Sequence, residues 1–143
     1  MGIRPGLKER NLTLNNELET ISIEQNIGEV CAKAANLGAL TELKAHFDQD
    51  IRLVPAHEDL EFLGCDSVEM ALEKLFALTF GIKCNAIATG PLTIILNYRA
   101  SFDVGILDGL IKVTLNKLEK ITQIEIYGRP QPVLDQLNKK FLA

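Results

Sequence analysis

The spacing of apolar residues changes once along the chain, from a helical period to a period of two. Over residues 23–34, isoleucine, valine and alanine recur every three or four positions, which is typical of a helix with one buried face. From Lys83 onward, apolar and polar residues alternate, as in strands that bury one face of a sheet. We therefore expect helices in the first half of the chain and a sheet in the second.

The first half is expected to hold three helices and one short strand. In chain order we predict a helix that starts at a capping box in residues 22–25 and ends near Gly38, a short helix over 40–47, a turn at 48–50, a strand over 51–56 and a helix over 67–80. In the capping box, Ser22 and Gln25 satisfy the free amides of the first helical turn. The helix over 67–80 is apolar on most sides, which is typical of a helix packed between other elements.

The second half is expected to form four consecutive strands and a last helix. The predicted strands cover residues 84–90, 92–104, 109–117 and 121–127, with turns at Gly90–Pro91, 105–109 and 117–120 and a helix over 132–142. Consecutive strands that are joined by short turns must pair antiparallel. The predicted fold class is therefore α+β, with N-terminal helices packed on an antiparallel sheet.

Length and composition indicate one ordinary globular domain. The chain has 143 residues, of which 47% are apolar and 24% are charged, so it can bury a core without the help of a disulfide or a metal. We assign residues 1–20 to an N-terminal extension and residues 21–143 to the domain.

Charge and cysteine content bear on the partners and the compartment. The net charge is -4 and the basic residues are scattered, which argues against nucleic-acid binding. No apolar run approaches the length that spans a bilayer, so we expect no membrane association. The three cysteines lie far apart without a paired spacing, which favours free thiols in a cytoplasmic protein. We expect neither a metal site nor a cofactor.

Several strings, taken in order, resemble those of nuclear transport factor 2-like proteins, in particular their polyketide-cyclase-like and ketosteroid-isomerase-like branch. They are the segment Asn36–Phe47 with the aspartates at 48 and 50 after it, the strand Ile51–Pro55, the segment Phe62–Val68, and the strand Lys120–Tyr127 with Arg129–Pro130 after it. The resemblance covers roughly residues 23–134. It implies a cone in which a curved antiparallel sheet, a cystatin-like roll, encloses a pocket for a small, largely apolar ligand. It also implies homodimers that form through the outer surface of the sheet.

The catalytic sets of this superfamily do not carry over residue by residue. By the resemblance, the base, the tyrosine and the protonated acid of ketosteroid isomerases correspond to Val54, Cys31 and about Ile111, which are unsuited to those roles. Epoxide hydrolases hold an arginine and an aspartate two residues apart, whereas Arg99 and Asp103 are four apart. The resemblance thus implies a fold and a pocket, but it does not imply a reaction.

One predicted strand nevertheless offers a polar row. Asn97, Arg99, Ser101 and Asp103 share one face of this strand, and the other face is apolar apart from a tyrosine. If the row faces the pocket, Arg99 would bind an anionic or carbonyl group and Asp103 would be the general base. The alternative is that the row faces solvent or a dimer partner, as the polar side of an antiparallel sheet does.

Further candidates lie outside this row. His57 follows the first strand, where a histidine with a pKa near neutrality could shuttle protons; the alternative is a solvated acidic loop. The other candidate ligand contacts are Tyr98, Tyr127, Phe62, Phe76 and Phe80. Each of these aromatic residues could instead be a plain core or interface residue.

We expect a protein that binds a small hydrophobic molecule in the cone pocket and forms a homodimer in the cytoplasm. One alternative is an enzyme of the same fold, an isomerase, epoxide hydrolase or cyclase, that uses Asp103 and Arg99 or His57. A second alternative is a protein-interaction module that works through the outer surface of the sheet. The first two hypotheses predict that Arg99 and Asp103 point into an enclosed cavity.

Overall fold

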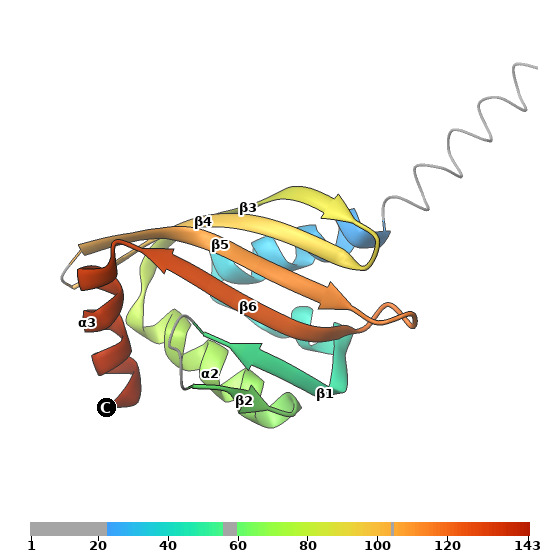
Figure 1. The fold of residues 1–143 in the computed structure, drawn as a ribbon, viewed down its shortest axis with the longest axis horizontal. Helices are drawn as coiled ribbons and strands as arrows, with labels where there is room; N and C mark the ends of the chain where they lie inside the picture. The colour runs from blue at the N-terminus through green and yellow to red at the C-terminus, as the bar shows by residue number, and fades with distance from the viewer. Residues whose placement is uncertain (1–22, 56–59, 104) are drawn as a thin grey trace, which may run out of the picture.

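The computed structural model describes residues 23–55, 60–103 and 105–143, which form a six-stranded sheet with helices packed against it (Figure 1). The predicted extension at residues 1–20, Ser22 of the predicted capping box, and His57 lie outside these residues. In chain order the elements are a helix over 23–37, the 3₁₀ helix η1 (Leu43–His46), β1 (Phe47–Val54), β2 (Phe62–Leu63), α2 (Cys65–Leu78), β3 (Phe80–Gly90), β4 (Thr93–Phe102), β5 (Gly105–Leu115), β6 (Ile121–Arg129) and α3 (Gln131–Leu142). The α+β class that the sequence predicted is confirmed.

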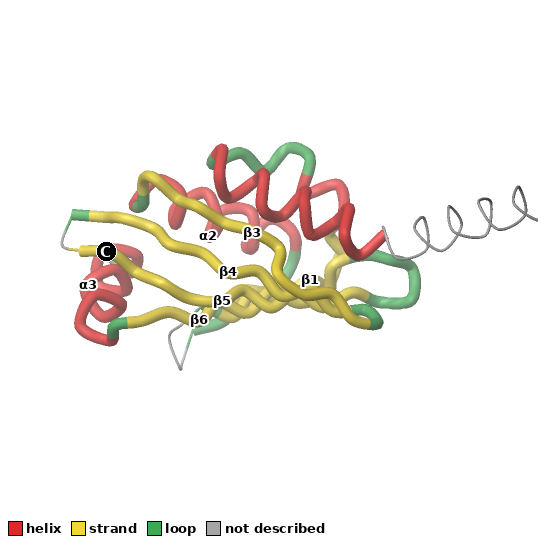
Figure 2. Tube along the Cα trace, turned by 90° about the horizontal axis from the view of Figure 1, so that it is seen from above, coloured by secondary structure: helices red, strands yellow, loops and turns green. Residues whose placement is uncertain are grey.

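The strands lie in the order β2-β1-β6-β5-β4-β3. The pairs β3–β4, β4–β5 and β5–β6 are antiparallel, as the short turns between them predicted. β1 pairs antiparallel with β2 but parallel with β6, so the sheet is mixed and open. The first helix and α2 lie along one side of the strands, and α3 lies by the start of β5 and the end of β6 (Figure 2). No helix in the described part of the chain is long and apolar enough to cross a membrane.

β1 is longer than predicted and contains the residues that were expected to form a turn at 48–50. It begins at Phe47, whose side chain is buried in the core. The Asp48 carboxylate accepts hydrogen bonds from the Asp50 main-chain N–H and from the Asn116 side chain. An aspartate that accepts a hydrogen bond from the main chain two residues later is typical of a turn. Here the bond lies beside a register shift in the pairing of β1 with β6. The polar segment is therefore an irregularity within a strand.

The boundaries of the other predicted elements shift for local reasons. The short helix expected over 40–47 is reduced to η1, because Phe47 already belongs to β1. The predicted helix over 67–80 runs from Cys65 to Leu78, and β3 begins at Phe80. The largest difference is β5, which begins at Gly105 although residues 105–109 were expected to form a turn. Gly109, the second glycine of that segment, lies inside β5 rather than in a turn.

The core lies between the inner face of the sheet and the helices. Alternate strand residues are almost wholly buried there, including Ile51, Ile94, Leu96, Val113 and Ile121. Each such side chain contributes about 1.5–3 kcal/mol when it leaves water. No polar or charged residue in the described segments is buried, so the interior is stabilised by apolar packing.

Asn36 closes part of the free edge of β3. Its side-chain oxygen accepts a hydrogen bond of 2.7 Å from the Cys84 main-chain N–H, and its amide group donates one of 3.0 Å to the Cys84 carbonyl. A side-chain amide that bonds in both directions replaces a neighbouring strand at that point. It also fixes the end of the first helix against the sheet, which positions the helix over the pocket.

Candidate functional site

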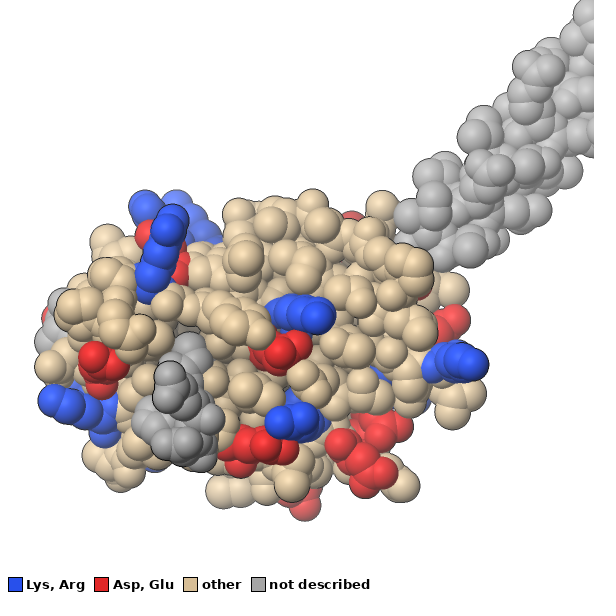
Figure 3. Space-filling model, in the orientation of Figure 1, with Lys and Arg blue, Asp and Glu red and all other residues tan. Residues whose placement is uncertain are grey.

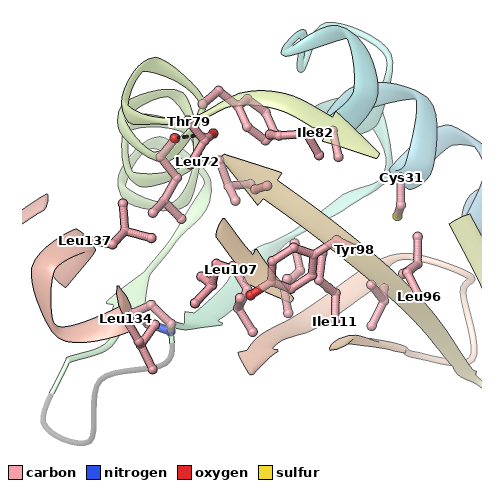
Figure 4. A pocket seen from close by; sticks show the side chains of 18 of the residues that line it. Cys31, Leu72, Thr79, Ile82, Leu96, Tyr98, Leu107, Ile111, Leu134 and Leu137 are labelled. Carbon is pink, nitrogen blue, oxygen red and sulfur yellow. Dashed lines mark hydrogen bonds between the residues drawn. The ribbon is translucent and has the colours of Figure 1, made fainter. Parts of the chain in front are cut away.

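A pocket of about 120 Å³ lies between the inner face of the sheet and the helices. β4, β5 and β6 form one side of it, and the first helix, α2 and α3 contribute most of the remainder. Thr79 and Leu72 lie on one side, with Tyr98, Leu107 and Ile111 across from them (Figure 4). Nearly every lining side chain is a hydrocarbon.

The alternation along β4 determines which side chains reach the pocket. Leu96, Tyr98 and Ala100 point inward and line it. The register with β5 places Ile111 opposite Leu96 and Leu107 opposite Ala100, so the same face continues across the sheet. The face that the sequence marked as apolar is therefore the wall of the pocket.

Tyr98 lies over a pair of glycines on the inner face of the sheet. It is opposite Gly109 in the β4–β5 pair, and Gly109 is opposite Gly128 in the β5–β6 pair. A methyl group on Gly109 or Gly128 would lie 2.8 Å or 2.7 Å from the Tyr98 hydroxyl oxygen, and one on Gly109 would also lie 1.8 Å from the Tyr127 carbonyl oxygen. These two positions must therefore lack a side chain, which explains why a glycine that resembles a turn signal stands inside β5.

The hydroxyl groups at the pocket are both hydrogen-bonded to the main chain. The Tyr98 hydroxyl donates to the Tyr127 carbonyl at 2.9 Å, and the Thr79 hydroxyl donates to the Leu75 carbonyl at 2.9 Å. Burial raises the pKa of Tyr98, and the charges of Asp108 and Cys84 add to this effect. Tyr98 is therefore a neutral phenol at physiological pH.

The thiol at the pocket is also neutral. Burial, and to a lesser extent the charge of Cys84, raises the pKa of the Cys31 thiol to about 12. Burial raises the pKa of nearby Cys84 to about 11. Because the thiolate is the reactive form, neither cysteine is an activated nucleophile at neutral pH.

The prediction that Arg99 and Asp103 point into the cavity is wrong. Arg99 lies on the outer face of β4, with 64% of its side chain exposed, and its Nε is 2.7 Å from Oδ1 of Asp108 on β5. Asp103 lies in the turn after β4, 65% exposed, and accepts a hydrogen bond from Lys140. That bond lowers the pKa of Asp103, which makes the carboxylate a weaker base. Charged side chains stay on the solvent side because burying them in an apolar pocket is costly.

The remaining predicted site residues divide between the two faces of the sheet. Tyr98 and Phe76 line the pocket. Phe62 instead packs edge-to-face against Phe141 of α3, with ring centroids 5.7 Å apart. Asn97, Ser101, Tyr127 and Phe80 belong to the outer face, where Tyr127 is 53% and Phe80 is 58% exposed.

Sequence reasoning missed one ion-pair partner on the outer face and two residues of the pocket. Asp108, the partner of Arg99, was assigned to a turn because two glycines flank its segment. Thr79 was treated as the end of a helix, and Asn138 of α3 was not considered, yet both line the pocket. By contrast, Cys31 and Ile111 do line it, at two of the three positions that the resemblance to isomerases had marked.

The described residues hold no metal cluster, and the face in Figure 3 shows no concentration of positive charge. No group of three or more histidine, cysteine, aspartate or glutamate residues there could hold a metal ion. On the face shown in Figure 3, positive and negative side chains are interspersed over a largely uncharged surface. Where pairs form, as between Arg99 and Asp108, they are exposed, and such pairs contribute little to stability.

The sequence matches no protein-family model and none of the curated proteins. The structure, however, resembles several solved structures. A steroid delta-isomerase from Pseudomonas aeruginosa superposes with a TM-score of 0.75 at 15% identity, over 84% of this chain and 89% of the isomerase. An uncharacterized protein with a cystatin-like fold from Silicibacter pomeroyi DSS-3 gives 0.71 at 18% identity, over 77% of this chain and 78% of that protein.

An NTF2-like protein of unknown function from Cytophaga hutchinsonii gives a TM-score of 0.61 at 14% identity, over 78% of this chain and 94% of that protein. Identities this low show a common fold and leave the reaction open. The superpositions extend over about four fifths of this chain, so the helices and the curved mixed sheet share one arrangement with these neighbours. The chain therefore has the nuclear transport factor 2-like, cystatin-like fold that its sequence predicted.

Proposed function

We propose that this protein binds a small, largely apolar molecule in the pocket on the inner face of the sheet. The observation that carries the proposal is the pocket itself, which has a volume of about 120 Å³ and a lining that is almost wholly hydrocarbon. Ligand pockets are typically concave and mostly apolar, with a few polar groups that fix the orientation of the ligand. A ligand that fills this pocket removes apolar surface from water.

The size of the pocket limits the ligand to about one ring. An apolar cavity of about 150 Å³ holds one benzene molecule, whereas drug-sized ligands occupy pockets of about 300–1,000 Å³. The lining residues also carry no charge at neutral pH, because Cys31 and Tyr98 are the titratable groups among them and both have raised pKa values. A charged ligand would lose its hydration without gaining a partner.

Toluene tests the proposal in a thermal-shift assay, with an NMR titration to confirm the site. Ala100→Leu adds bulk at a buried position that lines the pocket, and we expect it to abolish the shift. Ala45→Leu makes the same change at an exposed position in η1, and it should bind toluene like the wild type. Equal binding by the wild type and Ala100→Leu would show that the pocket is not the site.

The placement of Arg99 and Asp103 does not support the enzyme hypothesis in the form that uses them. Both lie outside the pocket and both are paired with other charged residues. No carboxylate or histidine in the described segments lines the pocket. Binding is the function that the lining supports.

We also propose that the protein is a homodimer through the outer face of the sheet. Leu110 and Tyr127 form a cross-strand pair there, 45% and 53% exposed, with Ile106 nearby on β5 at 50%. The neighbouring Arg99–Asp108 pair supplies both signs of charge, so two copies of this face can meet about a twofold axis without repulsion. Exposed apolar side chains grouped on one face are typical of an interface.

Light scattering on a sizing column tests the dimer. Leu110→Glu should give a monomer, whereas Leu118→Glu, in the exposed turn before β6, should leave the dimer intact. A monomer mass for the wild type at micromolar concentration would contradict the proposal. This outcome would not affect the proposed ligand pocket, which lies on the opposite face.

We infer a reducing compartment, such as the cytoplasm, from the state of the thiols. Cys31, Cys65 and Cys84 are all free, and two of them are buried. Free buried thiols are common where glutathione keeps cysteines reduced. Titration of the denatured protein, purified without reductant, should find three free thiols; a lower number would contradict this inference.

A further inference from the structure

We propose that the ligand of this pocket is a neutral single-ring alcohol or phenol whose hydroxyl donates a hydrogen bond to the Tyr98 oxygen. The inference rests on the proposed binding function and specifies the chemical class of the ligand. It follows from the direction of the hydrogen bonds at the pocket and from the way in which Tyr98 is held.

The Tyr98 hydroxyl has an acceptor to offer but no free proton. Its partner, the Tyr127 carbonyl, can only accept, so the hydroxyl must be the donor in the 2.9 Å bond. The same argument applies to Thr79, whose proton goes to the Leu75 carbonyl. Each hydroxyl oxygen keeps lone-pair capacity. The two hydroxyls therefore offer acceptors to a ligand in a pocket whose other side chains, apart from Cys31 and Asn138, are hydrocarbons.

The geometry around Tyr98 keeps this arrangement in place. The ring lies over Gly109 and Gly128, so the hydroxyl oxygen comes within van der Waals reach of both main chains. Turning the proton toward a ligand would break the bond to Tyr127 and leave that carbonyl without it. A ligand that donates a hydrogen bond to the Tyr98 oxygen leaves the bond to the Tyr127 carbonyl intact. A ligand that must accept a hydrogen bond from Tyr98 would break that bond.

A ketone or aldehyde of the same size fits this pocket less well. Its oxygen would need a donor, and Cys31 offers only the weak S–H donor of a neutral thiol. A carboxylate or an amine cation would be worse, because the lining carries no charge to compensate for its lost hydration. The side-chain amide of Asn138 also lines the pocket, so the test includes a variant at this position.

Cyclohexanol, cyclohexanone and toluene are the probes, each titrated into the full chain and followed by two-dimensional NMR. We expect the wild type to bind cyclohexanol about fivefold more tightly than cyclohexanone, which is the worth of one neutral hydrogen bond. Tyr98→Phe keeps the ring and removes the acceptor, so it should bring the two affinities within about twofold. Its affinity for toluene should stay close to that of the wild type.

Two matched variants locate the acceptor. Thr79→Val and Asn138→Leu should both keep the preference for the alcohol, and loss of the preference in either one but not in Tyr98→Phe would overturn the assignment to Tyr98. An intermolecular nuclear Overhauser effect between cyclohexanol and the Tyr98 ring provides a test in the unmutated protein. Its absence at saturation would also overturn the assignment, even if Tyr98→Phe failed to fold.

The probes separate this inference from the proposed function. If toluene binds but cyclohexanone binds as tightly as cyclohexanol, the pocket binds apolar molecules and the inference on ligand class is wrong. If none of the three probes binds, the proposed function fails and the ligand class fails with it. Binding of all three with the expected preference supports both.

Discussion

Replacing Gly128 by alanine should destabilise the protein through one identifiable contact, which a second substitution can remove. The new methyl group would lie 2.7 Å from the Tyr98 hydroxyl oxygen and 3.1 Å from Cδ2 of Leu107. The first distance is too short for any real contact, so the hydroxyl must move away. Its movement would break the hydrogen bond to the Tyr127 carbonyl.

The size of the effect follows from these two losses. Overpacking in a filled interior costs about 1–3 kcal/mol, and one lost hydrogen bond costs about 1 kcal/mol. We therefore expect Gly128→Ala to lower the free energy of unfolding by about 3 kcal/mol in the wild type. In the Tyr98→Phe background the clashing oxygen is absent and the nearest atom is that of Leu107, so the cost should fall to about 1 kcal/mol.

Urea titration followed by far-ultraviolet circular dichroism measures these values, because the chain has no tryptophan to report unfolding. A loss of about 3 kcal/mol moves the midpoint by about 1.5 M at a typical slope of about 2 kcal/mol per molar urea. Gly90→Ala is the control, because no atom lies within 4 Å of its new methyl group. The reasoning fails if Gly128→Ala costs the same in both backgrounds, or no more than Gly90→Ala does.

Gly109→Ala extends the same comparison to the neighbouring strand. There the methyl group would lie 1.8 Å from the Tyr127 carbonyl oxygen, which belongs to the main chain. Removing the Tyr98 hydroxyl cannot relieve that contact. We therefore expect Gly109→Ala to be severely destabilising in both backgrounds, and rescue by Tyr98→Phe would contradict the geometry.

Three further predictions follow from single side chains. Burial raises the pKa of Cys31 from 9.0 to about 12, so above pH 9 the unfolded chain releases a proton that the folded chain retains. The free energy of unfolding should therefore fall by about 1 kcal/mol from this group between pH 7 and pH 10; Cys31→Ala should remove that share in urea titrations, and an unchanged pH dependence would contradict it. Arg99→Ala and Asp103→Asn should bind toluene within about twofold of the wild type. A tenfold loss of affinity in the NMR titration would show that these residues belong to the binding site. Asn36→Ala removes the partner of the Cys84 main-chain N–H and carbonyl, so it should lower the free energy of unfolding by about 1–3 kcal/mol in the same urea assay. An unchanged free energy of unfolding would show that water replaces the amide.

The sequence predicted the elements of this fold better than it predicted their pairing. Alternation after Lys83 identified the four long strands, because each one buries a single face and leaves a local pattern of period two. The parallel pairing of β1 with β6 leaves no such pattern, because the two strands lie far apart in the chain and no turn connects them directly. The start of β5 was misplaced because Gly105 and Gly109 resemble turn residues. Gly109 is required instead by the approach of the β6 main chain and the Tyr98 hydroxyl.

The site was predicted in outline but on the wrong face of the sheet. The polar row of Asn97, Arg99 and Ser101 suggested chemistry, and the hypothesis of a site required it to face inward. The hydrophobic effect determined the outcome, since the apolar face of the same strand covers the core and the charged face remains in water. Tyr98 was the informative residue, because a tyrosine on the apolar face must find a hydrogen-bond partner inside. Sequence alone could not show that this partner is the Tyr127 main-chain carbonyl, which the hydroxyl reaches by lying over Gly109 and Gly128.

The chemistry at the isomerase-like positions favours binding over proton transfer. A general base works best when its pKa lies near the working pH, yet the position that corresponds to the isomerase base is Val54, a hydrocarbon. The positions of the tyrosine and the acid hold Cys31, a thiol with a pKa of about 12, and Ile111, a second hydrocarbon. Tyr98, the one phenol at the pocket, gives its proton to the main chain rather than to the cavity. Both hydroxyl groups at the pocket give their protons to the main chain, so they are better placed to accept a hydrogen bond from a bound alcohol than to stabilise a developing negative charge. The same structural facts that argue against isomerase-type chemistry therefore support the proposed class of ligand.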